Sequence, residues 1–274
     1  MKRLIIGFCL TISAFSLFAQ DQPKKKSERD EKKEARREKI NNLIRQQEEG
    51  ALVFNKQSVF GFRLNTDGWS ILYEKGYLKS VSTTNLFSLE FGEKKHPKEK
   101  KLNNILSNSG FLQIGSPYVY GKQNSFYQLK PTFGQQRLLG GKTNKNGVAV
   151  SAIYAGGISI GLERPYYVRV QDSGPDGTRD IKYSVEDSVA FLAPGNIIQG
   201  TGLRYGWNQL KVVPGAHVKA ALRFDYGRFN EMVSAIEVGM NLEAYSREIN
   251  IMLKNKNSQV FFNGYVAILF GKRK

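Results

Sequence analysis

Two neighbouring segments, residues 216–226 and 232–245, alternate between apolar and polar side chains over ten or more positions each. Successive side chains of a β-strand point to opposite faces, so the alternation predicts two strands joined by a turn at 227–231. The apolar face holds Val218, Ala220, Leu222, Phe224, Tyr226, Met232, Ile236, Val238, Met240, Leu242 and Ala244. A soluble sandwich would show the same alternation, but strands of this length can also cross a bilayer at a tilt. In that case a closed barrel puts the apolar side in lipid and the charged side in its lumen.

The first twenty residues favour the membrane interpretation. Lys2 and Arg3 precede an apolar run at 4–18, and residues 17–20 offer a loose small-residue cleavage site. This pattern is typical of a secretory signal peptide over residues 1–20. Cys9, the one cysteine of the sequence, falls inside that peptide, so we expect no disulfide, thiol chemistry or cysteine-bound metal in the exported chain.

Residues 21–50 are dense in charges of both signs and carry a weak apolar stripe at Ile40, Leu43 and Ile44. We expect a charged, partly helical periplasmic arm, either a flexible spacer or a docking helix for a periplasmic protein. The formal charge is 41 − 24 = +17, and the basic excess lies chiefly at 94–101, 137–145 and 272–274.

The rest of the chain, residues 51–274, predicts an all-β fold. Besides the two strands above, alternation predicts strands at about 56–66, 69–78, 84–93, 122–139, 147–162 and 258–271. Asp67 and Gly68 form a strong hairpin signal between the first two. Small residues on the inward face of 147–162 suit a narrow, filled barrel.

Loop lengths predict the strand number. In bacterial outer-membrane barrels the periplasmic turns are short and the external loops are long. Counting back from residue 274 places 247–257, 163–213 and 94–121 outside, which predicts an antiparallel transmembrane β-barrel of eight strands. If 181–194 and 199–209 are strands as well, the number becomes ten.

Several short motifs resemble a family of small, uncharacterised outer-membrane β-barrel proteins of the Bacteroidota, of the OmpA and OmpX barrel type. The motifs are FGEKKHPKE at 91–99, YGKQN at 120–124, PYY at 165–167, PG at 214–215 followed by Lys219, IEVG at 236–239 and FGKRK at 270–274. The resemblance covers roughly residues 50–274. It implies the barrel fold and an outer-membrane location, and it implies no activity.

Nine charged residues fall on the predicted inward face: Arg63, Glu74, Glu90, Lys130, Lys219, Arg223, Asp225, Glu237 and Glu243. Four positive and five negative charges nearly neutralise one another. Because the interior of an eight-stranded barrel is just wide enough for side chains to fill, we expect a plugged lumen. Arg223 and Glu237 are predicted to lie opposite or diagonal across the 227–231 turn.

The lysines at 94–101 have two interpretations: a solvated external loop, or contact with lipopolysaccharide phosphates through Lys94, Lys95, Lys98, Lys100 and Lys101. Lysine binds phosphate as a point charge and requires no fixed geometry. Nucleic acid is a poor partner, because the signal peptide exports the chain.

Catalytic motifs are weak. The GISIG sequence at 157–161 matches a nucleophile elbow by letter, but it lies inside an alternating strand rather than a strand-to-helix turn. The GGKT sequence at 140–143 lacks the first glycine of a P-loop, since position 136 is Gln136. His96 and His217, the two histidines, are both expected near the external rim, where a lipid hydrolase would need a serine and an acidic partner beside one of them.

The sequence therefore predicts an outer-membrane barrel with a structural, binding or assembly-accessory role, with neither catalysis, cofactor nor metal. A narrow transport channel and a rim-located lipid-modifying enzyme are the alternatives. The expected partners are outer-membrane lipid, including lipopolysaccharide, and a periplasmic protein at residues 21–50.

Overall fold

The computed structural model describes residues 32–34, 36–37, 54–80, 82–103, 105–108, 111–142, 147–172, 174, 177–227 and 231–274. The chain divides into two compact units, Met1–Gln46 and Gln47–Lys274. In the first unit the described residues, 32–34 and 36–37, are helical. The predicted signal peptide, 1–20, and most of the predicted arm, 21–50, lie outside the described residues.

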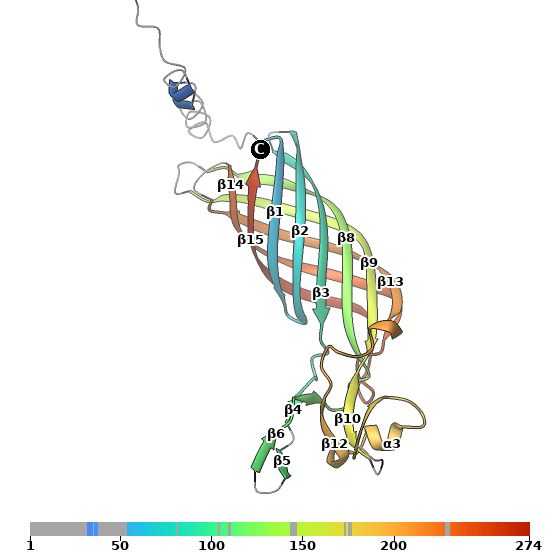
Figure 1. The fold of residues 1–274 in the computed structure, drawn as a ribbon. Coiled ribbons are helices and arrows are strands. Elements are labelled where there is room, and N and C mark those ends of the chain that lie inside the picture. Colours follow the sequence, from blue (N-terminus) through green and yellow to red (C-terminus); the bar gives the residue numbers. More distant parts are fainter. Residues whose placement is uncertain are drawn as a thin grey trace, which may run out of the picture. The chain divides into compact units, whose positions relative to one another are not determined.

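The second unit contains a closed antiparallel barrel of eight strands (Figure 1). The barrel strands are β1 (Lys56–Asn65), β2 (Gly68–Ser80), β3 (Thr83–Lys94), β8 (Asn124–Gly140), β9 (Ala149–Pro165), β13 (Lys211–Asp225), β14 (Met232–Ile249) and β15 (Ser258–Arg273). Each strand pairs with its sequence neighbour in the barrel, and β1 closes the ring against β15. The prediction of eight strands is confirmed.

The two ends of the barrel differ in their connections. One end, called here the turn end, carries the short links 80–83, 140–149 and 225–232 together with residue 274. The other, the loop end, carries the hairpin 65–68 and the long segments 94–124, 165–211 and 249–258. The alternation of short and long connections is the one that the sequence predicts.

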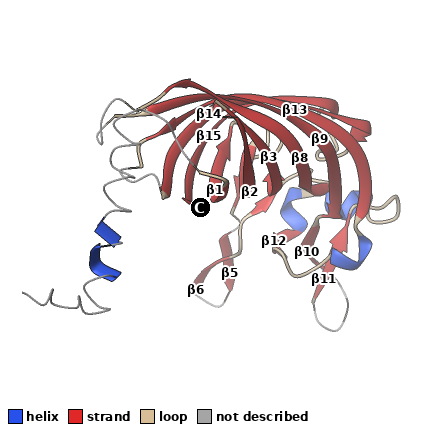
Figure 2. Ribbon diagram, turned by 90° about the horizontal axis from the view of Figure 1, so that it is seen from above, coloured by secondary structure: helices blue, strands red, loops and turns tan. Residues whose placement is uncertain are grey.

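The described elements of the second unit that lie outside the barrel wall all belong to the long segments of the loop end. They are β4 (Lys101–Leu102), β5 (Ile105–Asn108), β6 (Phe111–Ile114), β7 (Tyr118–Val119), β10 (Tyr167–Gln171), β11 (Thr178–Lys182), α3 (Ser188–Phe191), η1 (Pro194–Asn196), β12 (Ile197–Gly200) and η2 (Trp207–Gln209). The ten-strand alternative is wrong, because 178–182 and 197–200 pair with β10 in a separate three-stranded sheet. Helical turns lie beside this sheet and not in the barrel wall (Figure 2).

The stagger of the barrel follows from the strand register. A row of paired residues can be followed from strand to strand around the ring. It begins at Lys56 on β1, passes through Tyr77, Asn85, Gln135, Tyr154, Ala220, Met240 and Gly264, and reaches β1 again at Thr66. The row therefore rises from residue 56 to residue 66 of one strand, a stagger of ten residues. Such a stagger tilts the strands by about 40° and fixes which residues face one another across the lumen.

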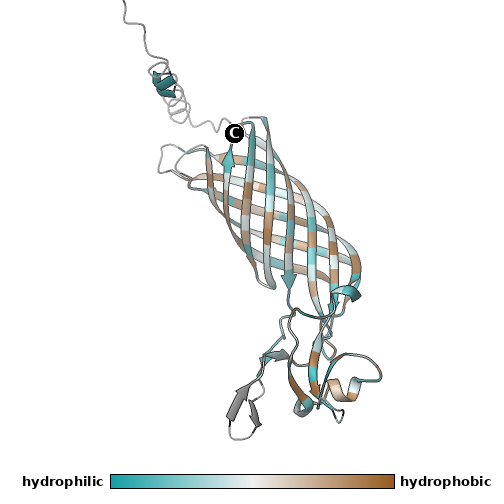
Figure 3. Cartoon of the chain, in the orientation of Figure 1, coloured by the Kyte–Doolittle hydropathy of each residue, from teal (hydrophilic) through white to brown (hydrophobic). Residues whose placement is uncertain are grey.

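Alternation sorts side chains between the two surfaces of the wall. Large apolar residues such as Phe60, Val218 and Phe262 are exposed on the outer surface, whereas Arg63, Arg223 and Glu237 are buried inside. The colouring of Figure 3 shows apolar and polar residues alternating along the strands. An apolar exterior around a polar interior is the arrangement that a transmembrane β-barrel requires. In the described part of the chain, no helix is long and apolar enough to cross a membrane.

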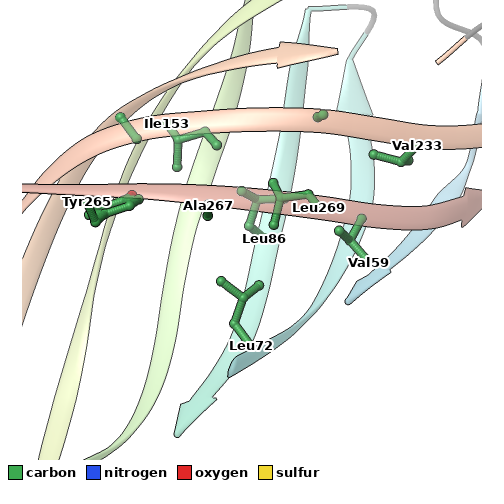
Figure 4. Packing of buried hydrophobic residues seen from close by; sticks show 10 residues of the cluster. Val59, Leu72, Leu86, Ile153, Val233, Tyr265, Ala267 and Leu269 are labelled. Carbon is green, nitrogen blue, oxygen red and sulfur yellow. The ribbon is translucent and has the colours of Figure 1, made fainter. Parts of the chain in front are cut away.

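Inside the barrel, an apolar cluster fills part of the half nearer the turn end. Val59, Leu72, Leu86, Ile153, Val233 and Leu269 belong to it, and each is at most 3% exposed. Figure 4 shows these side chains gathered within the barrel. Val59 is paired with Glu74, so this cluster packs beside buried charges of the lumen.

An aromatic band marks the outer surface at the loop end. The ring of Trp207 stacks on that of Tyr127 with 5.5 Å between centroids, and Tyr127 stacks on Phe91 at 6.1 Å. On the neighbouring strand, Trp69 Nε1 donates a hydrogen bond to Glu93 Oε2 at 3.2 Å. Amphipathic aromatic side chains gather at the interface between membrane and water, so we expect a membrane boundary at this band.

The sequence holds two tryptophans, Trp69 and Trp207, and both belong to this band. In vesicles, lipids brominated near the head group should quench the fluorescence of Trp69→Phe and Trp207→Phe more strongly than lipids brominated at the chain ends. A tryptophan introduced at Leu222, on the outer surface of mid-wall β13, should show the opposite order. Stronger quenching of both native tryptophans at the chain ends would contradict the placement.

Candidate functional site

The structure places all nine predicted lumen charges on the inner face of the barrel, each at most 7% exposed. Buried charges require partners, because removing an ion from water costs several kcal/mol. Eight of the nine form ion pairs within the lumen. Lys219 is the exception among the described residues, since no carboxylate lies within ion-pair distance of its amine.

The network nearer the turn end is built around Arg223. Its guanidinium binds Glu74 with two hydrogen bonds, Nη1 to Oε1 at 2.7 Å and Nη2 to Oε2 at 2.9 Å. It also donates to Glu237 Oε2 from Nε at 3.0 Å and from Nη2 at 2.7 Å. As the sequence predicts, Arg223 lies directly opposite Glu237 on the neighbouring strand. Two-pronged guanidinium–carboxylate pairs are among the strongest hydrogen bonds in proteins.

Glu237 joins this network to the next. Its Oε1 accepts a hydrogen bond from the Tyr265 hydroxyl at 2.7 Å and one from Arg63 Nη2 at 3.4 Å. Arg63 also pairs with Glu90, and its guanidinium lies 3.9 Å from the centre of the Tyr265 ring. Lys130 Nζ then bridges Glu90 and Glu243, at 3.0 Å from an oxygen of each. One connected chain of charges therefore runs along the lumen.

Lys94 belongs to this lumen and not to the external basic loop, which corrects the prediction of a phosphate contact for it. It is the last residue of β3, it is 1% exposed, and its amine lies 2.8 Å from Asp67 Oδ2 and 3.1 Å from Glu243 Oε2. Strand β3 extends one residue further than the alternation predicts, and position 94 is on its inward face.

Arg273 is a second lumen charge that the sequence reasoning missed. The basic ending 272–274 suggests a solvated tail, but β15 continues to Arg273, whose guanidinium pairs with Asp225. Lys142 Nζ approaches the other oxygen of Asp225 at 3.3 Å. Continuing the inward parity of Asn263 and Tyr265 to position 273 would have indicated it.

An aromatic layer closes the lumen at the loop end. Phe126 and Tyr245 are 0% and 2% exposed, and their ring centroids are 5.2 Å apart. Phe261 packs against both rings. This layer covers the loop-end side of the charge network, whose turn-end part lies beside the apolar cluster, since Val59 is paired with Glu74. The described residues therefore line a filled lumen rather than an aqueous pore.

His217 lies inside the lumen rather than near the external rim, which corrects the predicted position. It is 4% exposed, with Nε2 at 2.9 Å from Thr132 Oγ1 and Nδ1 at 3.0 Å from Ser159 Oγ. Ser159, the serine of the GISIG motif, is itself fully buried. Two hydroxyls thus occupy both ring nitrogens, and no carboxylate among the described residues is hydrogen-bonded to this imidazole. A hydrolase requires a reachable nucleophile and an oriented base, and this arrangement offers neither.

The three long segments of the loop end interlock into one cap. The Lys122 amine pairs with Glu99 Oε2 at 2.8 Å, which ties 94–124 to itself beside a bridge between Lys122 and Met252. The Tyr120 hydroxyl donates to the Leu192 carbonyl at 2.9 Å and accepts from Lys254 Nζ at 3.2 Å. Segments distant in sequence therefore hold one another in place.

The cap has its own apolar core. It consists of Tyr118, Tyr166, Val168, Val170, Ile181, Phe191 and Ile197. The Tyr166 hydroxyl accepts a hydrogen bond from the Val119 amide at 3.1 Å, and burial raises the pKa of this phenol. A core of this kind makes the cap a folded module and not a set of solvated loops.

A polar pocket of about 310 Å³ opens between the cap and the barrel strands. Its lining includes Glu163, Lys182, Tyr183, Lys211, Arg247 and Asn250. Arg247 binds Glu163 with two hydrogen bonds, at 2.6 and 3.3 Å. Lys182 Nζ donates to Gln209 Oε1 at 2.7 Å. An aromatic ring, amides and excess positive charge suit a polar, anionic ligand such as a phosphorylated sugar.

Four of the five lysines that were predicted to contact phosphate lie in an exposed loop. Lys95, Lys98, Lys100 and Lys101 are exposed. His96 lies in the same loop, where its Nδ1 accepts a hydrogen bond from the Lys98 amide at 3.2 Å. Within the described residues, no group of three or more histidine, cysteine or acidic side chains is placed to hold a metal.

The buried network makes Glu237 critical for stability. Glu237→Ala leaves Arg223 and Arg63 without one partner each, so we expect it to destabilise the barrel by about 3–5 kcal/mol. Glu248→Ala removes an exposed carboxylate from the same strand and should change stability by less than about 0.5 kcal/mol. Urea unfolding followed by gel mobility of unboiled samples measures both.

The double variant Arg223→Ala with Glu237→Ala should lose less than the two single losses added together, because neither charge is left alone. Additive losses would show that the two residues do not interact in the folded barrel.

The ion pair of Arg169 and Asp180 gives the cap a pH dependence. The hydrogen bond from Arg169, at 2.7 Å, lowers the pKa of the Asp180 carboxyl. A depressed pKa means that the pair stabilises the β10–β11 hairpin above the unfolded pKa of about 4, and that the contribution disappears as pH falls through the lower, folded value. The protection factors of the hairpin amides, which correct for the pH dependence of intrinsic exchange, should therefore fall at acidic pH in the wild type. Asp180→Asn should show fast exchange already at neutral pH, and identical profiles for the two proteins would contradict the assignment.

No protein-family model matches the chain, and no curated protein matches its sequence. Solved structures with similar folds include the N-terminal β-barrel domain of Pseudomonas aeruginosa OprF, with 8% identity, 80% of this chain and 98% of that chain covered, and a TM-score of 0.33. Neisserial surface protein A has 9% identity, coverage of 81% and 97%, and a TM-score of 0.36. Ail, the attachment invasion locus protein of Yersinia pestis, in complex with the heparin analogue sucrose octasulfate, has 9% identity, coverage of 81% and 100%, and a TM-score of 0.34. Similarities at this level carry no argument about function, so the fold rests on the strand pairing described above.

Proposed function

We propose that this chain is an outer-membrane β-barrel protein that conducts no solute and serves a structural or binding role through its cap. The apolar outer surface, the aromatic band at the loop end and the predicted signal peptide support the location. With the loop end outside the cell, the cap is the part available to ligands and partners.

The filled lumen is the observation that carries the proposal. Arg63, Arg223 and Glu237 are at most 2% exposed, whereas an aqueous channel would leave its lining charges open to water. Ion pairs and apolar side chains together fill the lumen, and an aromatic layer covers it at the loop end. The narrow channel and the lipid-modifying enzyme rank lower, because the first lacks a wet path and the second a reachable serine.

The cap offers two features for binding anionic groups. One is the polar pocket that includes Lys182, Lys211 and Arg247. The other is the set of exposed lysines at 95, 98, 100 and 101. Phosphates of external lipopolysaccharide carry the complementary charge and lie at this level of the membrane, so we propose that lipopolysaccharide is the ligand of the exposed lysines.

The conductance of the wild-type protein tests the filled lumen. Because side chains fill the lumen, planar-bilayer recordings should show no steady open channel at moderate voltage. Folded protein is verified by altered gel mobility without boiling. A persistent channel of sizeable conductance would refute the proposal.

The lysines are tested by the quadruple change of Lys95, Lys98, Lys100 and Lys101 to Gln. Lipopolysaccharide binding should weaken and its salt dependence should flatten, because exposed charges act within about 8 Å at physiological salt. The matched control changes Lys56, Lys79, Lys272 and Lys274, four exposed lysines of the turn end, and should leave binding unchanged. Equal lipopolysaccharide binding by both quadruple variants would mean that the basic loop is a solvated surface and not the binding site.

A further inference from the structure

The outer surface of the barrel is not uniform around its circumference. On β13, β14 and β15 the outward residues of the mid-wall are apolar, for example Leu222, Val238 and Val266. On β2, β3, β8 and β9, in contrast, polar and basic side chains reach the outer surface in the half nearer the turn end. We call this set the polar ladder; it consists of Lys75, Tyr77, Asn85, Gln135, Arg137 and Tyr154.

Hydrogen bonds connect the ladder across three strands. The Tyr154 hydroxyl donates to Gln135 Oε1 at 2.6 Å, and Gln135 Nε2 donates to Asn85 Oδ1 at 3.2 Å. The Arg137 guanidinium lies 5.5 Å from the centre of the Tyr154 ring. Amides on a lipid-facing surface are costly unless they are bonded, and these amides hold one another in a fixed row.

An apolar groove of about 530 Å³ lies beside the ladder, further from the turn end. Its lining includes Tyr73, Lys75, Phe87, Phe133, Gly156 and Ile158. Two features of the chain form it. Gly156 has no side chain to fill the outer surface, and at Pro131, which has no amide hydrogen, the pairing of β8 with β9 is interrupted between Leu129 and Thr132.

The groove and the ladder differ in charge from the rest of the wall. Lys75 borders the groove and Arg137 lies at the ladder, and both are exposed. Among the described outward-facing residues of β2, β3, β8 and β9, the one carboxylate is Glu93, which lies at the loop end and accepts the hydrogen bond of Trp69. Cations on a membrane-facing surface need an anion or access to the head-group region. The protein supplies no such anion here.

We propose that this face binds one anionic phospholipid of the leaflet at the turn end. An acyl chain lies in the apolar groove, Lys75 contacts the phosphate, and Arg137 with the amides of the ladder contacts the rest of the head group. Surface cations attract anionic lipid, and an apolar groove holds a chain more firmly than a smooth wall does. The site rests on the membrane location proposed above, but not on the closed lumen or the cap.

Native mass spectrometry of the full chain, released from detergent micelles doped with phosphatidylglycerol, tests the site. The wild type should retain one phosphatidylglycerol under conditions that strip the other lipids. Lys75→Gln with Arg137→Gln should reduce retention at least tenfold. Lys272→Gln with Lys274→Gln removes the same charge from the same end of the barrel and should leave retention unchanged.

The groove is tested separately from the charges. Leu89→Trp places a large ring on the exposed edge of the groove and should reduce retention as strongly as the double charge variant, whereas Val238→Trp on β14 should not. Soluble glycerol phosphate, which has the head-group anion but no chain, should not displace the lipid. Gel mobility without boiling identifies folded variants.

Equal retention by the two charge variants, or displacement by glycerol phosphate, would overturn the proposal. Preferential retention of lipopolysaccharide over phosphatidylglycerol would also overturn it, since that lipid belongs to the other leaflet. A conducting wild-type barrel would refute the closed lumen and leave this result unaffected, so the two failures are distinguishable.

Discussion

The cost of burying charge is the constraint on which the rest of this structure depends. Arg223 contacts Glu74 and Glu237 in a lumen where water does not hydrate them, so the three side chains must keep their geometry together. Arg223 and Glu237 come from the neighbouring strands β13 and β14, and Glu74 comes from β2 on the other side of the ring. Their contact therefore ties the closure of the barrel to its ten-residue stagger, because another register would leave buried charges unpaired.

This dependence explains why a filled lumen and a folded cap occur together. A barrel that transports solutes must leave its interior free, and its loops must not obstruct entry. Here the interior is used to fix the wall, with Lys130 bridging Glu90 and Glu243 near the loop end. The cap can then cover the loop end of the barrel without blocking any transport. Its own core around Tyr166 and Phe191 gives the long segments of the loop end a defined surface.

Sequence reasoning reached the features that depend on neighbouring strands. Period-two alternation predicted the inward face, and the hairpin at 227–231 predicted the pairing of Arg223 with Glu237. Contacts between strands that are not neighbours could not be predicted. The ion pair of Arg63 with Glu237 is one of them, because it depends on the closure and the stagger of the barrel and not on a local sequence pattern. Lys94 and Arg273 were missed at strand ends, where residues in a basic run look like solvated loops. The cap was missed because its short strands carry no periodic signal.

The inner and outer surfaces of the wall differ in how their charged and polar side chains are paired. Inside, every predicted lumen charge except Lys219 has an ion-pair partner among the described residues. Outside, the amides of Asn85 and Gln135 are hydrogen-bonded to each other, whereas Lys75 and Arg137 approach aromatic rings and form no ion pair with the described residues. A ring satisfies a cation weakly at an exposed site. The paired lumen and the unpaired outer cations therefore differ, and this difference supports the proposed lipid site, in which the membrane supplies the anion.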